Sequence, residues 1–456
     1  MLPVRIRFPQ GAFARLRAGL LRDRRNEAFA LLFGRRETVA GATVIRVIET
    51  HFPADHDYEN RSLAHLRLRR EYVYDRLVEM QASTDADTVI DVHTHPFSLR
   101  GAAFSGQDDA DETAFYRWLT DTLNDVHYAS IVLSQSDYSA RLWLRSESRI
   151  VHEPAAALAQ TAVEQWPNAA EAEPPEERLA AMDPNEGFLA RSVLALGLDA
   201  LRRIVHDQQI AVIGVGGLGS AIAENLIHSG FHHVHLVDHD CVEPTNLNRI
   251  VGAGAADASS RRPKVQVVSE HLKRINPKAR IEAHPSSIED EGLLPVLAQC
   301  DWLLLATDNH ASRFAAQQIA LRFGIPLISA GINIQVTDGQ IEDMSGEIIT
   351  ARWGDGFCLN CLGRINPTQI AAETVPDLGG ELFRRGYVAG REVKEPAVKT
   401  LNAILAARAV DALLNQYTGR QRQAPILVYE DNQTPSMYPD TESLTRRPKD
   451  CFHCAC

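Results

Sequence analysis

Side chains that could hold a catalytic metal ion occur in the stretch VIDVHTHPFSLRGAAFSGQDDAD. His93 and His95 stand two residues apart at the end of a run, Thr88 to His93, whose β-branched residues predict a strand. Because alternate residues of a strand point to the same side, both imidazoles would face one metal ion. With Asp108 they would supply three protein ligands and leave a fourth position for water, whose pKa zinc lowers to roughly 7. We therefore predict a catalytic zinc site at His93, His95 and Asp108.

A carboxylate that moves protons is the second requirement of such a site, because the leaving amine must be protonated. Glu27 in NEAFALLFG precedes an apolar run and could be buried beside the metal. The order of these residues resembles that of the JAMM, or MPN-plus, zinc metallopeptidases over roughly residues 1–145. The full set in this chain is Glu27, His93, His95, Ser105 and Asp108.

The resemblance implies that Glu27 is the general acid/base and that Ser105 stabilises the oxyanion. The nine residues between His95 and Ser105 make this spacing longer than the family usually has. Asp109 and Asp111 are neighbouring carboxylates, so the choice of Asp108 as ligand is less constrained than that of the two histidines.

A glycine-rich loop follows a second candidate strand, QIAVIGV, at residues 209–215. Glycines let the backbone approach phosphates closely, and the start of the next helix offers free N–H groups to an anion. Asp238, after the following apolar run, could bind ribose hydroxyls. This pattern alone fits a dinucleotide-dependent oxidoreductase as well as an ATP-binding enzyme. The glycines are Gly214, Gly216, Gly217 and Gly219.

Charged residues further along the chain distinguish these two readings. Arg249 and Lys264 could neutralise a triphosphate, and Asp308 could hold Mg²⁺ as pyrophosphate leaves. A dehydrogenase needs no such set, whereas an adenylating enzyme does. The sequence therefore favours ATP with Mg²⁺ as cofactors.

From about residue 191 to the end, the chain resembles the ThiF, MoeB and ubiquitin-activating enzymes, which adenylate the C-terminal glycine of a ubiquitin-like protein. The motifs GVGGLGS, VDHDCVEPTNLNR, RPK, INP and ATDN occur in the family's order. The resemblance implies that Asp238 binds ribose and that Asp308 coordinates Mg²⁺. It implies phosphate contacts for Asn246, Arg249 and Lys264. It also implies that Arg191 reaches into the site of a partner subunit, and hence a homodimer.

Two Cys-x-x-Cys pairs, about ninety residues apart, could form a closed tetrahedral zinc site. The alternative is two unrelated reduced pairs. Many relatives of this type carry such knuckles, and many also carry a thioester-forming cysteine between them. Residues 362–450 contain no cysteine, and Cys241 and Cys300 lie beside apparent core strands. We therefore expect the reaction to stop at the acyl-adenylate. The pairs are Cys358 with Cys361 and Cys451 with Cys454.

Length and composition indicate a multidomain globular chain. It has 456 residues and a formal net charge of −12, which argues against a nucleic-acid partner. No apolar run is long enough for a membrane span, and no secretory signal is visible, so a cytoplasmic protein is expected. We predict a metallopeptidase domain at 1–150, an Ala/Glu/Pro-rich linker at 151–187, and an adenylating domain at 188–456.

The predicted fold class is α/β, with a JAMM-type α/β domain followed by a Rossmann-like ThiF-type domain that carries a zinc knuckle. Within the first domain, we expect strands at 44–48 and 88–93, a hairpin at 129–144, and a helix from Arg61 to Met80.

Both resemblances imply action at the C-terminus of a ubiquitin-like protein. The sequence therefore indicates an activating enzyme whose peptidase domain trims the modifier's precursor or removes the modifier from targets. A conjugating enzyme would then be a further partner. The main alternative is activation and release of a sulfur carrier in cofactor, cysteine or metabolite biosynthesis. A third reading is a scaffold with a decayed site, which the intact metal and nucleotide residues disfavour.

Overall fold

The chain divides into two compact units, Met1–Glu173 and Pro174–Cys456. The computed structural model describes residues 4–23, 25–62, 66–83, 85–96, 101–145, 149–158, 180–182, 187–205, 208–374 and 396–454. Residues 159–179 and 183–186 of the predicted linker lie outside these ranges.

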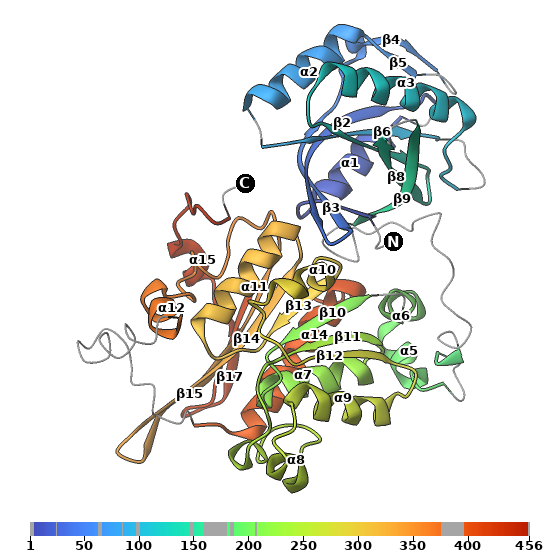
Figure 1. Cartoon of the computed structure of the whole chain (residues 1–456). Coiled ribbons are helices and arrows are strands. Elements are labelled where there is room, and N and C mark those ends of the chain that lie inside the picture. The colour runs from blue at the N-terminus through green and yellow to red at the C-terminus, as the bar shows by residue number, and fades with distance from the viewer. Residues whose placement is uncertain are drawn as a thin grey trace. The chain divides into compact units, whose positions relative to one another are not determined.

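The first unit is built around a closed barrel of strand order β1-β3-β2-β6-β7-β8-β9, which β1 closes by pairing with β9 (Figure 1). The barrel strands are β1 Val4–Arg7, β2 Phe29–Val39, β3 Ala42–His51, β6 Thr88–Thr94, β7 His127–Leu133, β8 Tyr138–Arg145 and β9 Ile150–Leu158. The remaining elements are α1 Ala12–Leu20, η1 Asp55–Asp57, β4 Tyr58–Arg61, β5 Leu66–Leu68, α2 Arg70–Ser83 and α3 Gly106–Thr122.

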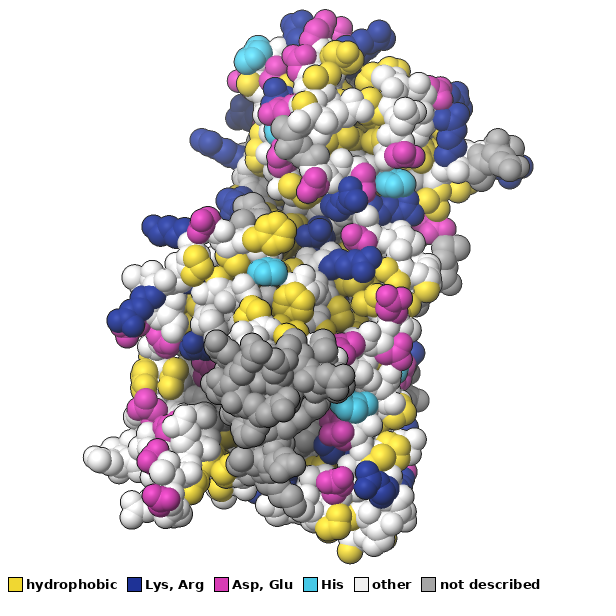
Figure 2. All heavy atoms as spheres, turned by 60° about the vertical axis from the view of Figure 1, so that its left-hand side comes forward, with side chains coloured by type: hydrophobic (Ala, Val, Ile, Leu, Met, Phe, Trp, Pro, Cys, Tyr) yellow, Lys and Arg dark blue, Asp and Glu magenta, His cyan; other side chains and the backbone are white. Residues whose placement is uncertain are grey.

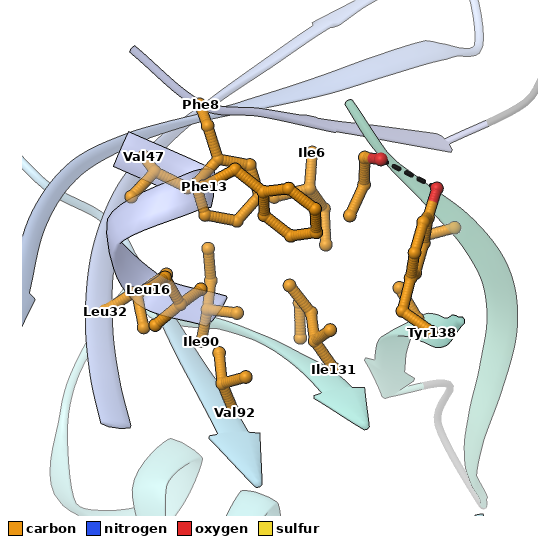
Figure 3. Packing of buried hydrophobic residues seen from close by; sticks show 14 of the residues in the cluster. Ile6, Phe8, Phe13, Leu16, Leu32, Val47, Ile90, Val92, Ile131 and Tyr138 are labelled. Atoms are coloured by element: carbon orange, nitrogen blue, oxygen red, sulfur yellow. Dashed lines mark hydrogen bonds between the residues drawn. The ribbon is translucent and has the colours of Figure 1, made fainter. Parts of the chain in front are cut away.

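Alternation along the strands produces two separate apolar cores in this unit. Ile90 and Val92 of β6 belong to the core that also contains Phe13 and Leu16 of α1, whose side chains point toward one another in Figure 3. Val89, from the other face of β6, packs in a second core with residues of α2 and α3. Because Asp91 and His93 share that second face, β6 directs them toward the helical side of the sheet.

Several expected elements of the first unit are confirmed. The strands at 44–48 and 88–93 lie within β3 and β6, and β7 and β8 form the expected antiparallel hairpin. The helix predicted from Arg61 was wrong at its start, because β4 and β5 pair with each other there and α2 begins only at Arg70. β9 also extends the barrel into the segment that was read as a linker.

The second unit contains an eight-stranded sheet of order β12-β11-β10-β13-β14-β15-β16-β17 (Figure 1). Neighbouring strands from β12 to β14 are parallel, and the pairs from β14 to β17 are antiparallel. The strands are β10 Gln209–Ile213, β11 His233–Val237, β12 Arg280–His284, β13 Trp302–Leu305, β14 Leu327–Thr337, β15 Gln340–Ala351, β16 Ile426–Glu430 and β17 Ser436–Pro439.

The α-helices of this unit are α5 Ala190–Leu196, α6 Leu198–Val205, α7 Gly217–His228, α8 Ala255–Ser259, α9 Lys264–Ile275, α10 Leu294–Leu297, α11 His310–Phe323, α12 Pro367–Thr374, α14 Lys399–Thr418 and α15 Glu442–Arg446. The 3-10 turns are η2 Pro244–Asn246 and η3 Glu291–Leu293. The predicted Rossmann-like arrangement is confirmed, since the glycine loop joins the parallel strand β10 to α7.

Basic and acidic side chains alternate over the face drawn in Figure 2, and the described residues there form no large patch of one charge. No helix among the described residues is long and apolar enough to cross a membrane.

Candidate functional site

The end of β6 and the start of α3 bring the three predicted zinc ligands together. One oxygen of Asp108 lies 3.4 Å from Nε2 of His93, and the other lies 3.5 Å from Nε2 of His95. Ser105 caps α3, because its hydroxyl accepts a hydrogen bond from the Asp108 backbone N–H at 3.2 Å. In return, the Ser105 N–H donates to the Asp108 carboxylate. This reciprocal cap fixes the carboxylate in front of the two imidazoles.

The charges of this group match a divalent cation. Although burial opposes protonation, the neighbouring Asp108 carboxylate and the charge of Asp91 raise the pKa of His93 to about 9. Burial, followed by the charge of His93, lowers the pKa of His95. Against the effect of its own burial, the neighbouring His93 lowers the pKa of Asp108. The three ligand atoms lie within 4.8 Å of one another, so a zinc ion would fit in place of the proton on His93.

Glu27 is held beside the same ligands by its backbone. Its N–H donates to the Ser62 carbonyl at 2.9 Å, and its carbonyl accepts from Nε of Arg61 at 2.7 Å. The next residue is fixed to Thr94 at the end of β6. Burial raises the pKa of Glu27, with His93 lowering it and Asp108 raising it in turn. The Glu27 carboxylate is thus half-buried and interacts electrostatically with two predicted zinc ligands, His93 and Asp108.

The competing carboxylates near Asp108 have other partners. Asp109 forms an ion pair with Arg141 at 2.5 Å, and Asp111 accepts a hydrogen bond from Gln107 at 2.9 Å. The structure therefore favours Asp108 among the three acidic residues that the sequence left open.

A buried acidic pair behind His93 was missed from the sequence. Asp91 and Glu112 each have a carboxylate oxygen without a hydrogen-bond partner among the described residues, and both lie within reach of His93. Tyr128 donates to the other oxygen of Asp91. Burial and the charge of Glu112 raise the pKa of Asp91 to about 7. Carboxylates in such places orient metal-bound imidazoles. The available signal was an acidic residue two positions before His93 on the same strand face.

The two Cys-x-x-Cys pairs meet in the second unit. The Sγ atoms of Cys358 and Cys451 are 3.9 Å apart, as are those of Cys361 and Cys454. A disulfide would require about 2.05 Å, whereas four thiolates about 2.3 Å from a tetrahedral zinc ion are about 3.8 Å apart. The geometry therefore fits one zinc ion.

The glycine loop is packed so closely that side chains are excluded at defined positions. A Cβ at Gly219 would lie 1.8 Å from the Gly214 carbonyl oxygen. A Cβ at Gly217 would lie 2.6 Å from Asn402 and 2.9 Å from the stem of Arg249. At Gly216, by contrast, a Cβ would meet nothing within 4 Å. Gly216 thus marks the open side of the loop.

Of the predicted ribose and phosphate residues, Asp238 contacts the glycine loop at Val215, and Arg249 approaches it at Gly217. The Asp238 carboxylate accepts the Val215 N–H at 2.7 Å and the Asp240 N–H at 2.8 Å. Nζ of Lys264 lies 2.7 Å from the Asp240 carboxylate. Asn246 is buried, and its side chain accepts the Glu243 N–H at 3.1 Å. This hydrogen bond stabilises the 3-10 turn η2, in which Asn246 lies.

Asp308 is exposed two residues after the carbonyl of Ala306, which packs against Gly214. The acidic side chain therefore follows β13 beside the glycine loop. Arg191 lies exposed on α5, and its predicted reach into a second subunit stays a prediction.

Comparison with known proteins now identifies the two units. Residues 189–451, more than half of the chain, match the model of the ThiF family.

The chain belongs to the ThiF family.

Residues 9–146 match the model described as prokaryotic homologs of the JAB domain. The chain thus joins an N-terminal JAB domain to a C-terminal ThiF adenylating domain, as the sequence predicted.

Curated relatives match part of this chain. A sulfur carrier protein adenylyltransferase of Thermus thermophilus is 29% identical over 221 residues, which cover 48% of this chain and 74% of the relative. A molybdopterin-synthase adenylyltransferase of Escherichia coli is 31% identical over 177 residues, or 38% and 67% of the two chains. An adenylyltransferase and sulfurtransferase of Aspergillus niger is 27% identical over 302 residues, or 65% and 58%.

Two further residues of the ThiF domain, which were not predicted, lie close to the predicted nucleotide residues: Asn402 at the glycine loop and Arg313 at the segment that carries Asp308. Asn402 of α14 contacts Gly217, although it lies 185 positions later in the chain. Arg313, on the first turns of α11, donates to the Thr307 carbonyl at 3.2 and 3.3 Å. Its place five residues after Asp308 was a readable signal, whereas the approach of Asn402 depends on tertiary packing.

The loop geometry predicts different effects for two similar substitutions. Gly219→Ala should lower the free energy of unfolding of the ThiF domain by about 1–3 kcal/mol or more, because the added methyl overlaps the Gly214 carbonyl. Gly216→Ala should leave thermal unfolding unchanged and weaken ATP binding, measured by calorimetry. Equal unfolding temperatures for the two variants would contradict the packing argument.

Removing ligands from the two zinc sites should also separate structure from chemistry. Cys358→Ser and His93→Ala should each lose about one zinc ion per chain by elemental analysis. Cys358→Ser should lower the unfolding temperature more, because its site joins distant segments of the ThiF domain. Cys241→Ser, outside the cluster, is the control. A larger destabilisation by His93→Ala would be the opposite of the expected order.

Proposed function

We propose that this chain uses ATP and Mg²⁺ to adenylate the C-terminal glycine of a ubiquitin-like protein, and that its JAB domain hydrolyses an amide or isopeptide bond at the same glycine. The observation that carries the proposal is the combination, in one chain, of a loop open at Gly216 and a group of two histidines with Asp108. The open glycine loop fits ATP-dependent activation of a carboxylate. The group of two histidines with Asp108 fits metal-dependent hydrolysis of an amide of that carboxylate.

In the adenylation step, the carrier's terminal carboxylate attacks the α-phosphorus of ATP and pyrophosphate leaves. Asp238, already oriented by two backbone N–H groups, would receive the ribose. Arg249 and Lys264 would neutralise the phosphates, with Lys264 exchanging its contact with Asp240 for the nucleotide. Asp308 would hold Mg²⁺ from its exposed position three residues after β13. Asn246 would contribute by holding the segment that carries Arg249.

In the cleavage step, His93, His95 and Asp108 would hold zinc, which lowers the pKa of water to about 7 when bound. Glu27 would accept a proton from the attacking water and deliver it to the leaving amine. Its half-buried place beside His93 and Asp108 supports this role. The Ser105 hydroxyl accepts from the Asp108 N–H and still has its own proton to donate to the oxyanion.

The reaction of the ThiF domain would stop at the acyl-adenylate, because residues 362–450 contain no cysteine that could form a thioester. A homodimer completed by Arg191 belongs to the same proposal, since an exposed arginine on α5 is available to a second subunit.

A second candidate is activation and release of a sulfur carrier. The relatives named as sulfur carrier protein and molybdopterin-synthase adenylyltransferases favour it. Both candidates share the adenylation step and differ in the acceptor of the activated glycine. Transfer of the activated carrier to a conjugating enzyme would favour modification of proteins. Reaction of the activated glycine with a sulfur donor would favour sulfur transfer.

Exchange of pyrophosphate into ATP tests the adenylation step. We expect exchange that depends on a carrier ending in glycine, and a loss of at least about 100-fold in Asp308→Ala, as typical for removal of one electrostatic contact in a transition state. Glu342→Ala, an exposed carboxylate on β15, is the matched control. Full exchange in Asp308→Ala with a native unfolding temperature would refute the role of Asp308.

Cleavage of a carrier extended beyond its glycine tests Glu27. Glu27→Gln should slow cleavage about 10²–10⁴-fold while the zinc content and pyrophosphate exchange stay unchanged. Glu71→Gln, exposed on α2, is the control. If wild-type protein with zinc cleaves neither an extended carrier nor a carrier–lysine conjugate, the peptidase proposal fails.

A further inference from the structure

A histidine-rich cluster lies on the edge of the ThiF sheet. His233 and His235 stand on one face of β11, and Glu282 and His284 stand on the adjoining face of β12. The two strands are parallel and in register, with His235 opposite Glu282. Four side chains with metal-binding atoms therefore share one side of two neighbouring strands.

The distances within this cluster are close to those between the ligands of one metal ion. Nδ1 of His235 lies 3.2 Å from Nε2 of His284 and 3.7 Å from Oε2 of Glu282. Nε2 of His233 lies 3.2 Å from Oε1 of Glu282. Donors about 2.0–2.1 Å from a tetrahedral zinc ion are about 3.3 Å from one another. Ligand atoms of His233, His235 and Glu282 all lie within 4.8 Å of one another.

One buried nitrogen of the cluster is also left without a partner. Nε2 of His235, a residue 3% exposed, has no hydrogen-bond partner within the described part of the chain.

We propose that His233, His235 and Glu282 bind a zinc ion, with a water molecule as the fourth ligand, separate from the four-cysteine site and from the JAB site. Two imidazoles, one carboxylate and a water molecule are a ligand set suited to zinc. Arg280 would remain the outer partner of the carboxylate, since its Nε donates to Oε1 of Glu282 at 2.7 Å. The ion can enter from the sheet edge, where Glu282 and His284 are only partly buried.

Such an ion would fasten the edge strand β12 to β11 beside the nucleotide loop. The Asp238 N–H donates to the His284 carbonyl at 3.3 Å, so the end of β11 that carries Asp238 already depends on the position of β12. Bound zinc would therefore stabilise the ThiF domain against unfolding.

The test uses the full chain, freed of metal with a chelator and reloaded with Zn²⁺. In His95→Ala, which removes the JAB site, X-ray absorption at the zinc edge should still show nitrogen and oxygen ligands beside the sulfur ligands of the four-cysteine site. Adding His233→Asn should remove that component and about one zinc ion per chain. His228→Asn, an exposed histidine at the end of α7, is the matched control and should remove neither.

Two results would overturn the proposal. The first is a zinc spectrum of His95→Ala with sulfur ligands alone, which requires no variant at the cluster. The second is unchanged zinc content after His233→Asn. Because the first measurement leaves all three proposed ligands intact, a folding defect in the second variant would not rescue the proposal.

Discussion

Partly buried carboxylates must be met by N–H donors or cations, and this constraint shapes both candidate sites. In the JAB domain, the Asp108 carboxylate is balanced by two imidazoles and by the capping N–H of Ser105. In the ThiF domain, Asp238 is balanced by two backbone N–H groups at the ends of β10 and β11. Each carboxylate is therefore in place before a metal ion or nucleotide arrives, which reduces the reorganisation that binding requires.

Under the proposed function, the two domains perform opposite reactions on one carboxyl group. Adenylation needs a free carboxylate at the end of the carrier, whereas a JAB-type peptidase would release such a carboxylate from an amide. A chain that contains both can prepare its own substrate or reverse the outcome of its own activation. The four-cysteine group and the histidine cluster on β11 and β12 belong to the ThiF domain, where they join segments that are distant in sequence.

Motifs confined to a few neighbouring residues were readable from the sequence, and contacts that arise from packing were not. The spacing of His93 and His95 predicted their shared direction, and the glycines predicted the loop that joins β10 to α7. The approach of Asn402 to Gly217 and of Glu112 to His93 joins distant segments. The β4–β5 pair replaced an expected helix because strand pairing depends on a partner that local periodicity does not reveal.

The central claim is that both domains act on the same glycine, and a carrier extended by one residue beyond that glycine tests it most directly. With ATP, Mg²⁺ and zinc, the wild-type chain should support pyrophosphate exchange only after a lag, during which mass spectrometry records loss of the extra residue. The Glu27→Gln chain should support no exchange with this carrier and full exchange with the carrier that ends in glycine. Immediate exchange with the extended carrier in both chains would contradict the account.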